Sequence, residues 1–376
     1  MIGKKPSANS LGAPWEQGSE FHLMENIRKD EHFESPWNRN GLFFGTGRDA
    51  IKAILVFGMA SMGWKRLWIP AYFCQKVVGA ILETGINVRC YQSWYPGKRG
   101  ENDFPYTVIR GDVVLIVNHF GLNSEIKFGF DRSNASAIIE DHTHDPWSSW
   151  AYKSKADYCI ASLRKTLPVP DGGVLWSPTN QELPVLPPIT EEHRYAAGNK
   201  LEAMRLKDLF LKGIIIDKSE YRTLSTSGEA NLCGRNVSAI SEWTAQKLGE
   251  FPVFEWRKAR KRNHQALLEA LLTLLRVQVI RSSIESDIVP FSFILLFKSA
   301  ECREFVRLRL IRASIFPAIF WSLEEPAIQG IPEEYVEASK RMLSLHCDMR
   351  YSTHDMHRVA EYVRNFGGES ISKICY

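Results

Sequence analysis

The pattern of apolar and polar residues divides the chain into three parts. Residues 1–40 show no clean period and carry scattered aromatic residues among polar ones. From Leu42 onward, short apolar runs of strand length alternate with helical stretches. The predicted strands cover 66–70, 87–91, 113–117, 137–140, 157–161 and 172–176, and the predicted helices cover 50–59 and 73–84. Continuous apolar strands that alternate with helices are typical of a mostly parallel sheet with helices on both faces.

The pattern changes after a proline-rich linker at 178–188. A helical region begins at Thr190, and later segments mix strands with helices, as an α+β domain does. The predicted helices here cover 238–248, 254–275, 300–312 and 353–365, and the strands cover 277–280 and 289–297. We therefore predict an α/β protein with an N-terminal arm (1–40), a large domain (41–250) and a small C-terminal domain (251–376).

One lysine has an unusual position in this pattern. Lys165 follows the strand at 157–161 and precedes a stiff turn with two prolines and two glycines. The turn forbids a long helix, so the lysine lies at a strand end that faces a crevice. An ammonium that leaves water needs a partner or a lowered pKa, and a lowered pKa makes the amine nucleophilic. The competing interpretation is a surface lysine in a turn.

Two further features point to a cofactor. Asp141 ends the strand at 137–140, where it can hold the ring nitrogen of pyridoxal phosphate, a cofactor that a Schiff-base lysine anchors. Near the start of the helix at 50–59, Gly45-Thr46-Gly47-Arg48 offers backbone N–H groups, a hydroxyl and a charge for a phosphate. The sequence therefore predicts pyridoxal phosphate as the cofactor.

At these positions the sequence resembles the DegT/StrS family of pyridoxal-phosphate-dependent sugar aminotransferases, in the fold-type I aminotransferase superfamily. Residues 45–46 stand where the family has its phosphate turn, and 69–73 where it has a stretch beside the cofactor. Residues 139–141 match its Ile-Glu-Asp, and Lys165 with 171–173 resembles its lysine followed by an acid and two glycines. The resemblance covers most of the chain and implies the fold-type I aminotransferase architecture.

The residues and the resemblance together give one set of candidate site residues. Lys165 is the candidate catalytic residue. The candidate cofactor contacts are Gly45, Thr46, Gly47, Arg48, Tyr72, Phe73, Asp141, His144, Ser162 and Lys165.

The chain also departs from the family pattern. His144 stands where a glutamine usually meets the 3-oxygen of the ring, and Ser162 is closer to the lysine than the family's serine. Residues 234–238 lack the family's asparagine and arginine at matching positions. We therefore interpret the chain as a divergent branch.

By resemblance, the predicted activity moves an amino group from an amino acid donor to a keto acceptor, a nucleotide-linked keto sugar. The resemblance also implies a homodimer in which the partner covers the phosphate. Two alternatives stay open: a pyridoxal-phosphate-dependent dehydratase or other carbanion chemistry on a sugar-like substrate, and a degenerate member that binds without catalysis.

Other motifs fit less well. Gly45 and Gly47 also match a loose dinucleotide fingerprint, but the next strand ends without the acid that would hold a ribose. Ser162 and Lys165 form the Ser-x-x-Lys of penicillin-binding enzymes without its companion motifs. His142 and His144 with neighbouring acids could bind a metal, but core or surface packing accounts for His142, and we predict no metal.

Composition limits the kinds of partner and the cellular location that we expect for the protein. The chain has 376 residues, 44% of them hydrophobic, and a formal net charge of only +4, which favours neither nucleic acid nor a membrane surface. The basic run at 257–262 is interpreted as a solvated helix face. We find neither an apolar run near eighteen residues nor the order of a signal peptide. Seven scattered cysteines without a C-x-x-C predict free thiols and a cytoplasmic protein.

Overall fold

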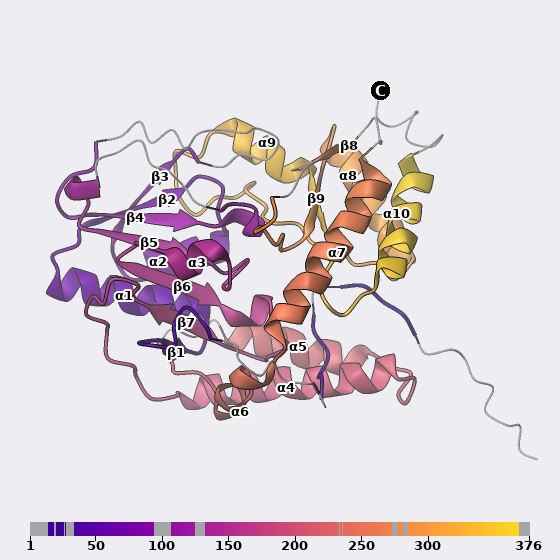
Figure 1. Cartoon of the computed structure of the whole chain (residues 1–376), viewed down its shortest axis with the longest axis horizontal. Helices are drawn as coiled ribbons and strands as arrows, with labels where there is room; N and C mark the ends of the chain where they lie inside the picture. The colour runs from indigo at the N-terminus through magenta and orange to yellow at the C-terminus, as the bar shows by residue number, and fades with distance from the viewer. Residues whose placement is uncertain are drawn as a thin grey trace, which may run out of the picture.

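The structure is a computed structural model of the chain. It describes residues 14–18, 20–25, 27, 34–93, 107–124, 132–232, 234, 236–272, 277–280 and 285–367. Within these residues, one large sheet and one small sheet lie side by side (Figure 1).

The large sheet has seven strands and is mostly parallel. In spatial order they are β1 (Leu42–Phe44), β7 (Gly173–Trp176), β6 (Tyr158–Ser162), β5 (Ala137–Asp141), β4 (Asp112–Val117), β2 (Arg66–Pro70) and β3 (Asn87–Tyr91). The strands from β6 to β3 are parallel, whereas β7 runs antiparallel to both β6 and β1. The carboxyl ends of β2, β4, β5 and β6 therefore meet at one edge, which is where open α/β sheets bind ligands.

Helices cover both faces of this sheet. One face packs on α1 (Gly47–Ser61) and α2 (Gln75–Leu82), and the other packs on α3 (Ser149–Lys153) and the start of α7 (Val253–Leu271). Along β4, Val113 and Leu115 belong to the first core and Val114 and Ile116 to the second. Because successive side chains of a strand point to opposite faces, an apolar run is buried on both sides.

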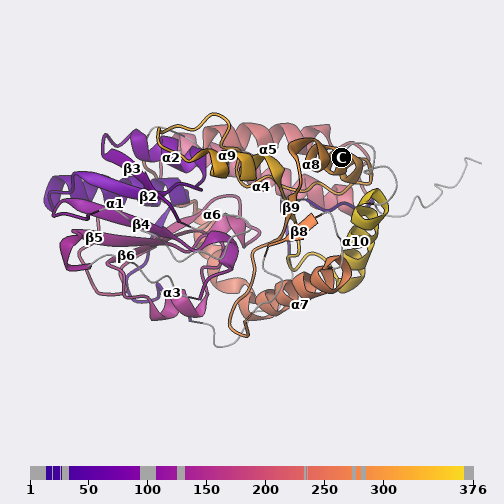
Figure 2. The same ribbon diagram turned by 90° about the horizontal axis from the view of Figure 1, so that it is seen from above.

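A small antiparallel sheet forms the second layer. Its strands are β8 (Val277–Val279), β9 (Phe293–Phe297) and β10 (Met342–Leu345), in the order β10-β9-β8. The helices around it are α8 (Ala300–Arg312), α9 (Glu333–Arg341) and α10 (Thr353–Gly367). Figure 2 shows α7 along one side of this sheet and α4 (Glu191–Leu211) with α5 (Ser219–Asn231) along the other.

The N-terminal segment joins this second layer. Trp15 Nε1 donates to Asp355 Oδ1 at 2.9 Å, and Gln17 Nε2 donates to the carbonyl of His346 at 2.7 Å. The side chain of Lys207, on α4, donates to the carbonyl of Glu20 at 2.9 Å. Residues 14–18 and 20–25 therefore lie between the small sheet and α4.

The predicted fold class is confirmed: a mostly parallel sheet covered by helices, with a smaller α+β part at the C-terminal end. The strands at 66–70 and 87–91 and the helix at 300–312 have the predicted bounds. The domain boundaries at residues 40 and 250 stay a prediction.

Some predicted elements were wrong in extent. The helix expected over 238–248 begins only with α6 (Glu242–Lys247), because Ser238 and Ile240 hydrogen-bond along β1 instead. The strand expected from residue 289 begins at Phe293, since Phe291 N donates to the carbonyl of Phe120 at 2.7 Å. Residues 273–275 of the helix predicted over 254–275 lie outside the described part.

The cysteines differ in part from the expectation. Cys74, Cys90, Cys159 and Cys347 are free. Cys302 is disulfide-bonded, so the prediction of free thiols was wrong there, and the other two cysteines lie outside the described residues. Among the helices that the structure describes, none is long and apolar enough to span a membrane.

Candidate active site

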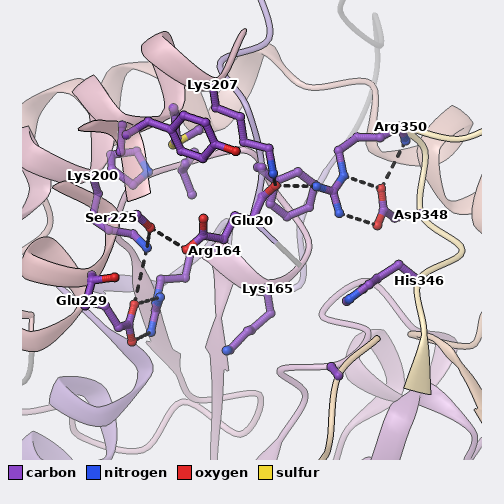
Figure 3. Close-up of a pocket in the computed structure, with 18 of the residues that line it drawn as sticks. Glu20, Arg164, Lys165, Lys200, Lys207, Ser225, Glu229, His346, Asp348 and Arg350 are labelled. Carbon is purple, nitrogen blue, oxygen red and sulfur yellow. Dashed lines mark hydrogen bonds and ion pairs between the residues drawn. The ribbon is translucent and has the colours of Figure 1, made fainter. Parts of the chain in front are cut away.

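Lys165 lies just beyond the carboxyl end of β6. A single 3₁₀ turn over Leu163–Lys165 follows the strand, and Thr166 N closes it on the carbonyl of Leu163 at 3.1 Å. The side chain opens onto a cavity of about 560 Å³ between the sheet edge, α4 and α5, and the small sheet (Figure 3). The Lys165 side chain as a whole is exposed to this cavity, but the protein atoms crowded around its amine hinder hydration, and this desolvation together with the charge of Arg164 lowers the pKa of Lys165 to about 8. A substantial share of the amine is therefore neutral near physiological pH.

The loop after Lys165 is held by Asp171. This fully buried carboxylate accepts hydrogen bonds from His193 Nε2 at 2.8 Å, Ser241 N at 2.8 Å and Ser241 Oγ at 2.7 Å, and it also accepts from Thr244 Oγ1. It thereby ties the loop to α4 and α6. The next residue, Gly172, has φ of 119°, a conformation that favours glycine. The acid and glycines that follow the lysine thus fix its position.

Asp141 ends β5, the strand next to β6. Its Oδ1 accepts from Thr143 N at 2.8 Å, and Thr143 Oγ1 accepts from Ser162 N at 3.0 Å, which links the two strand ends. Burial raises the pKa of Asp141. Among the described residues, no cation forms an ion pair with Asp141. A protonated ring nitrogen would supply the positively charged partner that stabilises the ionised carboxylate.

The N-terminus of α1 lies beside Ser162. A Cβ built on Gly47 would lie 3.0 Å from Ser162 Cβ, and one built on Gly45 would lie 2.2 Å from the ring of His193, so only glycine fits at position 45. In the first turn of α1, Asp49 N donates to Thr46 Oγ1 and Ala50 N donates to the Thr46 carbonyl. The positive end of the helix dipole still lies beside the Ser162 hydroxyl, and this arrangement favours a phosphate.

Thr46 does not have the free hydroxyl that the sequence suggested. As the N-cap of α1, its Oγ1 accepts from Asp49 N at 3.1 Å and donates to Asp49 Oδ2 at 2.8 Å. Burial raises the pKa of Asp49. Thr46 is therefore engaged with its own helix through its hydroxyl and through its carbonyl, which accepts from Ala50 N at 3.1 Å.

Arg48 belongs to a cluster of cations around one acid, Glu229 of α5. Arg164 forms a bidentate pair with Glu229 at 2.6 and 2.8 Å, while Arg48 and Lys200 approach it at 3.7 and 3.6 Å. Although burial alone would raise the pKa of Glu229, the charges of Arg164 and Lys200 hold it well below its usual range. The cluster has an excess of positive charge beside the start of α1.

His144 lies in an aromatic cluster at the same edge of the sheet. Its Nδ1 accepts from Phe120 N at 2.9 Å, and its ring stacks on Phe291 at 4.7 Å and Trp321 at 5.7 Å between centroids. Burial lowers the pKa of His144 to about 3, so the ring is neutral. Since Nδ1 accepts, the proton is assigned to Nε2, which can act as a donor.

Tyr72 and Phe73 are fully buried and do not line the cavity. The hydroxyl of Tyr72 donates to the carbonyl of Phe320 at 2.5 Å, and both rings contact Trp321. Their place in the core agrees with packing, the alternative interpretation of these two residues. A contact between either ring and a cofactor stays a prediction.

The cavity wall is rich in positive charge. Its charged lining residues are Lys76, Arg164, Lys165, Lys200, Lys207, Arg260 and Arg350 against Glu20, Glu229 and Asp348. Of these residues, only Lys165 was a candidate from the sequence, because the others come mostly from helices and loops far apart along the chain. An excess of cations in an enclosed site favours an anionic ligand.

The fold of the chain is similar to that of known proteins, although its sequence is not. No model of a known protein family matches the sequence, and no curated protein matches it. Among solved structures, Helicobacter pylori PseC, an aminotransferase involved in the biosynthesis of pseudoaminic acid, matches 94% of this chain and 99% of its own. The TM-score is 0.60 and the identity 11%. The chain has the fold of an aminotransferase.

Two further structures agree. DesI, solved in the presence of its TDP-sugar product, matches 90% of this chain and 83% of its own, with a TM-score of 0.56 and 14% identity. A DegT DnrJ EryC1 StrS aminotransferase from Brucella abortus matches 88% and 86%, with a TM-score of 0.51 and 12% identity. The likeness to the DegT/StrS family that the motifs suggested is thus confirmed at the level of the aminotransferase fold.

Proposed function

We propose that the protein is a pyridoxal-phosphate-dependent aminotransferase that moves an amino group from an amino acid to a nucleotide-linked keto sugar. One observation carries the proposal: the amine of Lys165, with its pKa of about 8, faces a cavity at a strand end next to the buried Asp141. The aminotransferase fold of PseC supports it, as does the structure of DesI in the presence of its TDP-sugar product.

The residues at the edge of the sheet fit this cofactor. Asp141 would hold the ring nitrogen, because it is buried and lacks a described cationic partner. The first turn of α1 and Ser162 would hold the phosphate, with Arg48 supplying charge. His144 Nε2 would donate to the ring's 3-oxygen, in place of the amide of the family's glutamine.

When bound, pyridoxal phosphate supplies an aldehyde that carries the amino group and a ring that withdraws electrons from the substrate's α-carbon. Asp141 would hold a proton on the ring nitrogen, because a buried carboxylate is stabilised by a cationic partner. Lys165 Nζ would take the proton from the α-carbon and deliver it to the carbon on the other side of the amino nitrogen, because a proton returned to the α-carbon would leave the amino group on the donor. A pKa of about 8 lets both protonation states of the lysine occur near neutral pH. Asp171 keeps the lysine loop in position.

The charge of the cavity supports a nucleotide-linked acceptor. A diphosphate carries negative charge that the lysines and arginines of the wall can bind, while its sugar reaches Lys165. We also propose a homodimer, in keeping with the fold-type I superfamily, with the partner completing the phosphate site.

Single-turnover amino transfer tests the proposal. The protein loaded with pyridoxal phosphate is mixed with L-glutamate, and 2-oxoglutarate and pyridoxamine phosphate are quantified. We expect both to form in amounts equal to the bound cofactor, and Lys165→Ala to abolish them. Lys155→Ala, at an exposed lysine after α3, is the matched control and leaves them unchanged.

The alternatives give other results. A dehydratase binds the cofactor but forms no 2-oxoglutarate, and a degenerate binding protein forms no covalent bond between Lys165 and the cofactor. Either result contradicts the proposed amino transfer.

A further inference from the structure

Arg260 is a buried arginine without a hydrogen-bond acceptor among the described residues. It lies in the middle of α7, is 3% exposed, and lines the same cavity as Lys165. Its Nε is shut off from solvent with no partner in the part of the chain that the structure describes. A guanidinium stays charged in proteins, and burying such a charge unpaired is costly.

The nearest carboxylates are already engaged by other arginines. Asp145 accepts from Arg257 Nε at 3.0 Å and from a terminal nitrogen of the same side chain at 2.7 Å. Asp348 accepts from Arg350 through two bonds of 2.8 Å, as Figure 3 shows. Neither acid forms an ion pair with Arg260 in the described structure, so the positive charge of Arg260 is left for a ligand.

The surroundings of Arg260 place it near the reacting end of the cavity. Its guanidinium carbon lies 5.9 Å from the centroid of the Phe291 ring, and that ring stacks on His144 at 4.7 Å. Phe291 also lines the cavity together with Lys165. A small anion held by Arg260 would therefore lie on the His144 side of the site, away from the Glu229 cluster at the start of α1.

We propose that Arg260 binds the carboxylate of the amino acid donor and of the keto acid that this donor becomes. This inference rests on the proposed function and names the group that recognises its donor. The planar guanidinium matches a carboxylate through two parallel hydrogen bonds, and it balances the single negative charge of one carboxylate. The phosphates have their own cations, since Arg48 and Arg164 lie beside the first turn of α1.

A purely structural role would look different. A structural arginine bonds to acceptors of its own chain, as Arg257 and Arg350 do. Replacing Arg260 by an apolar side chain of similar length should leave the ligand-free protein as stable or make it more stable, because an unpaired buried charge is removed. A binding residue costs stability when its ligand is absent.

Variants at position 260 test the proposal. Arg260→Met removes the positive charge, whereas Arg260→Lys keeps the charge but cannot form two parallel hydrogen bonds to a carboxylate. Arg262→Met is the matched control at an exposed position of the same helix. In single-turnover amino transfer, we expect Arg260→Met to raise the L-glutamate concentration at half-saturation on the order of 30-fold or more. Arg260→Lys should restore part of this loss, and Arg262→Met should match the wild type.

Thermal unfolding provides a readout that does not depend on the cofactor. Succinate, a carboxylate that cannot donate an amino group, should raise the melting temperature of the wild type and of Arg262→Met but not of Arg260→Met. Without succinate, Arg260→Met should melt at or above the wild-type temperature. A lower melting temperature with an unchanged succinate response would show a structural arginine and overturn the proposal.

The experiments distinguish a carboxylate site from a phosphate site at Arg260. They also distinguish a failure of the carboxylate site from a failure of the proposed amino transfer. If Arg260→Met weakens uridine diphosphate binding and leaves the succinate response intact, Arg260 binds phosphate and the inference is wrong. If the wild type transfers no amino group but its succinate response still requires Arg260, the proposed function fails while the carboxylate site stands.

Discussion

Glu229→Gln removes the acid at the centre of the cation cluster and tests whether this cluster is a phosphate site. Arg48, Arg164 and Lys200 would lose their common partner, and each of these side chains is no more than 14% exposed. Glutamine keeps the size of the side chain and removes the charge. The variant should therefore be less stable, and an added phosphate should take over the role of the lost carboxylate.

The size of the effect follows from burial. Breaking a fully buried ion pair costs about 3–5 kcal/mol, whereas an exposed pair contributes about 0–1 kcal/mol. The Glu229 side chain is 31% exposed, so the pair is screened in part. We expect the free energy of unfolding to fall by about 2 kcal/mol.

The pH dependence has a definite sign. The pKa of Glu229 is depressed in the folded state relative to 4.5, so its stabilising contribution is present above about pH 4.5 and is lost as the pH falls through the folded value. The difference in stability between wild type and Glu229→Gln should be constant near neutral pH. It should narrow only in acid.

Urea unfolding with and without inorganic phosphate measures both effects. Glu220→Gln, at an exposed position of α5, is the matched control. Phosphate should raise the urea midpoint of Glu229→Gln more than that of the wild type or the control. Equal stability of Glu229→Gln and wild type, or a loss that phosphate does not reduce, would refute the reasoning.

Three further predictions concern the stability of the lysine loop and the reactivity of Lys165. Asp171→Ala leaves the donors of His193, Ser241 and Thr244 without their buried acceptor. The free energy of unfolding, measured by urea titration, should therefore fall by about 3–5 kcal/mol, and a loss below about 1 kcal/mol would contradict the prediction. The reaction of Lys165 with pyridoxal phosphate should increase with pH around a midpoint of about 8, measured by absorbance after rapid mixing. Because Glu229 raises the pKa of Lys165, Glu229→Gln should move this midpoint to lower pH, and an upward shift would disprove the coupling.

The sequence predicted the parts of the site that follow from strand patterns. Asp141 is the last residue of one apolar strand and Lys165 follows another after a short turn, and such strands bring their ends to one edge of a parallel sheet. The turn chemistry after Lys165 was equally local, since its prolines and glycines exclude a helix. These residues could be brought together without any knowledge of long-range packing.

The cation cluster could not be predicted in this way. Glu229 lies on α5, whose sequence is rich in serine and threonine and has few apolar residues, so it lacks the amphipathic signal of a helix. This helix is stabilised by packing on α4, with Tyr221 buried against Leu206. Arg260 was part of a basic run interpreted as solvated, but its own position on α7 turns it toward the cavity.

Thr46 shows a local signal that was open to another interpretation. The hydroxyl was expected to bind phosphate, yet Thr46 and Asp49 have the spacing of a helix capping box, in which the threonine bonds to the backbone three residues later. The capping interpretation was available from the sequence alone. The structure shows that the cap is formed.

The most direct test of the central claim is to locate the covalent bond between the protein and pyridoxal phosphate. The purified protein is mixed with pyridoxal phosphate, reduced with borohydride, digested and mapped by mass spectrometry, with Lys155→Ala as the control. The account predicts a yellow complex that bleaches on reduction and leaves one label, on Lys165. A label on another lysine, or no visible complex, would contradict it.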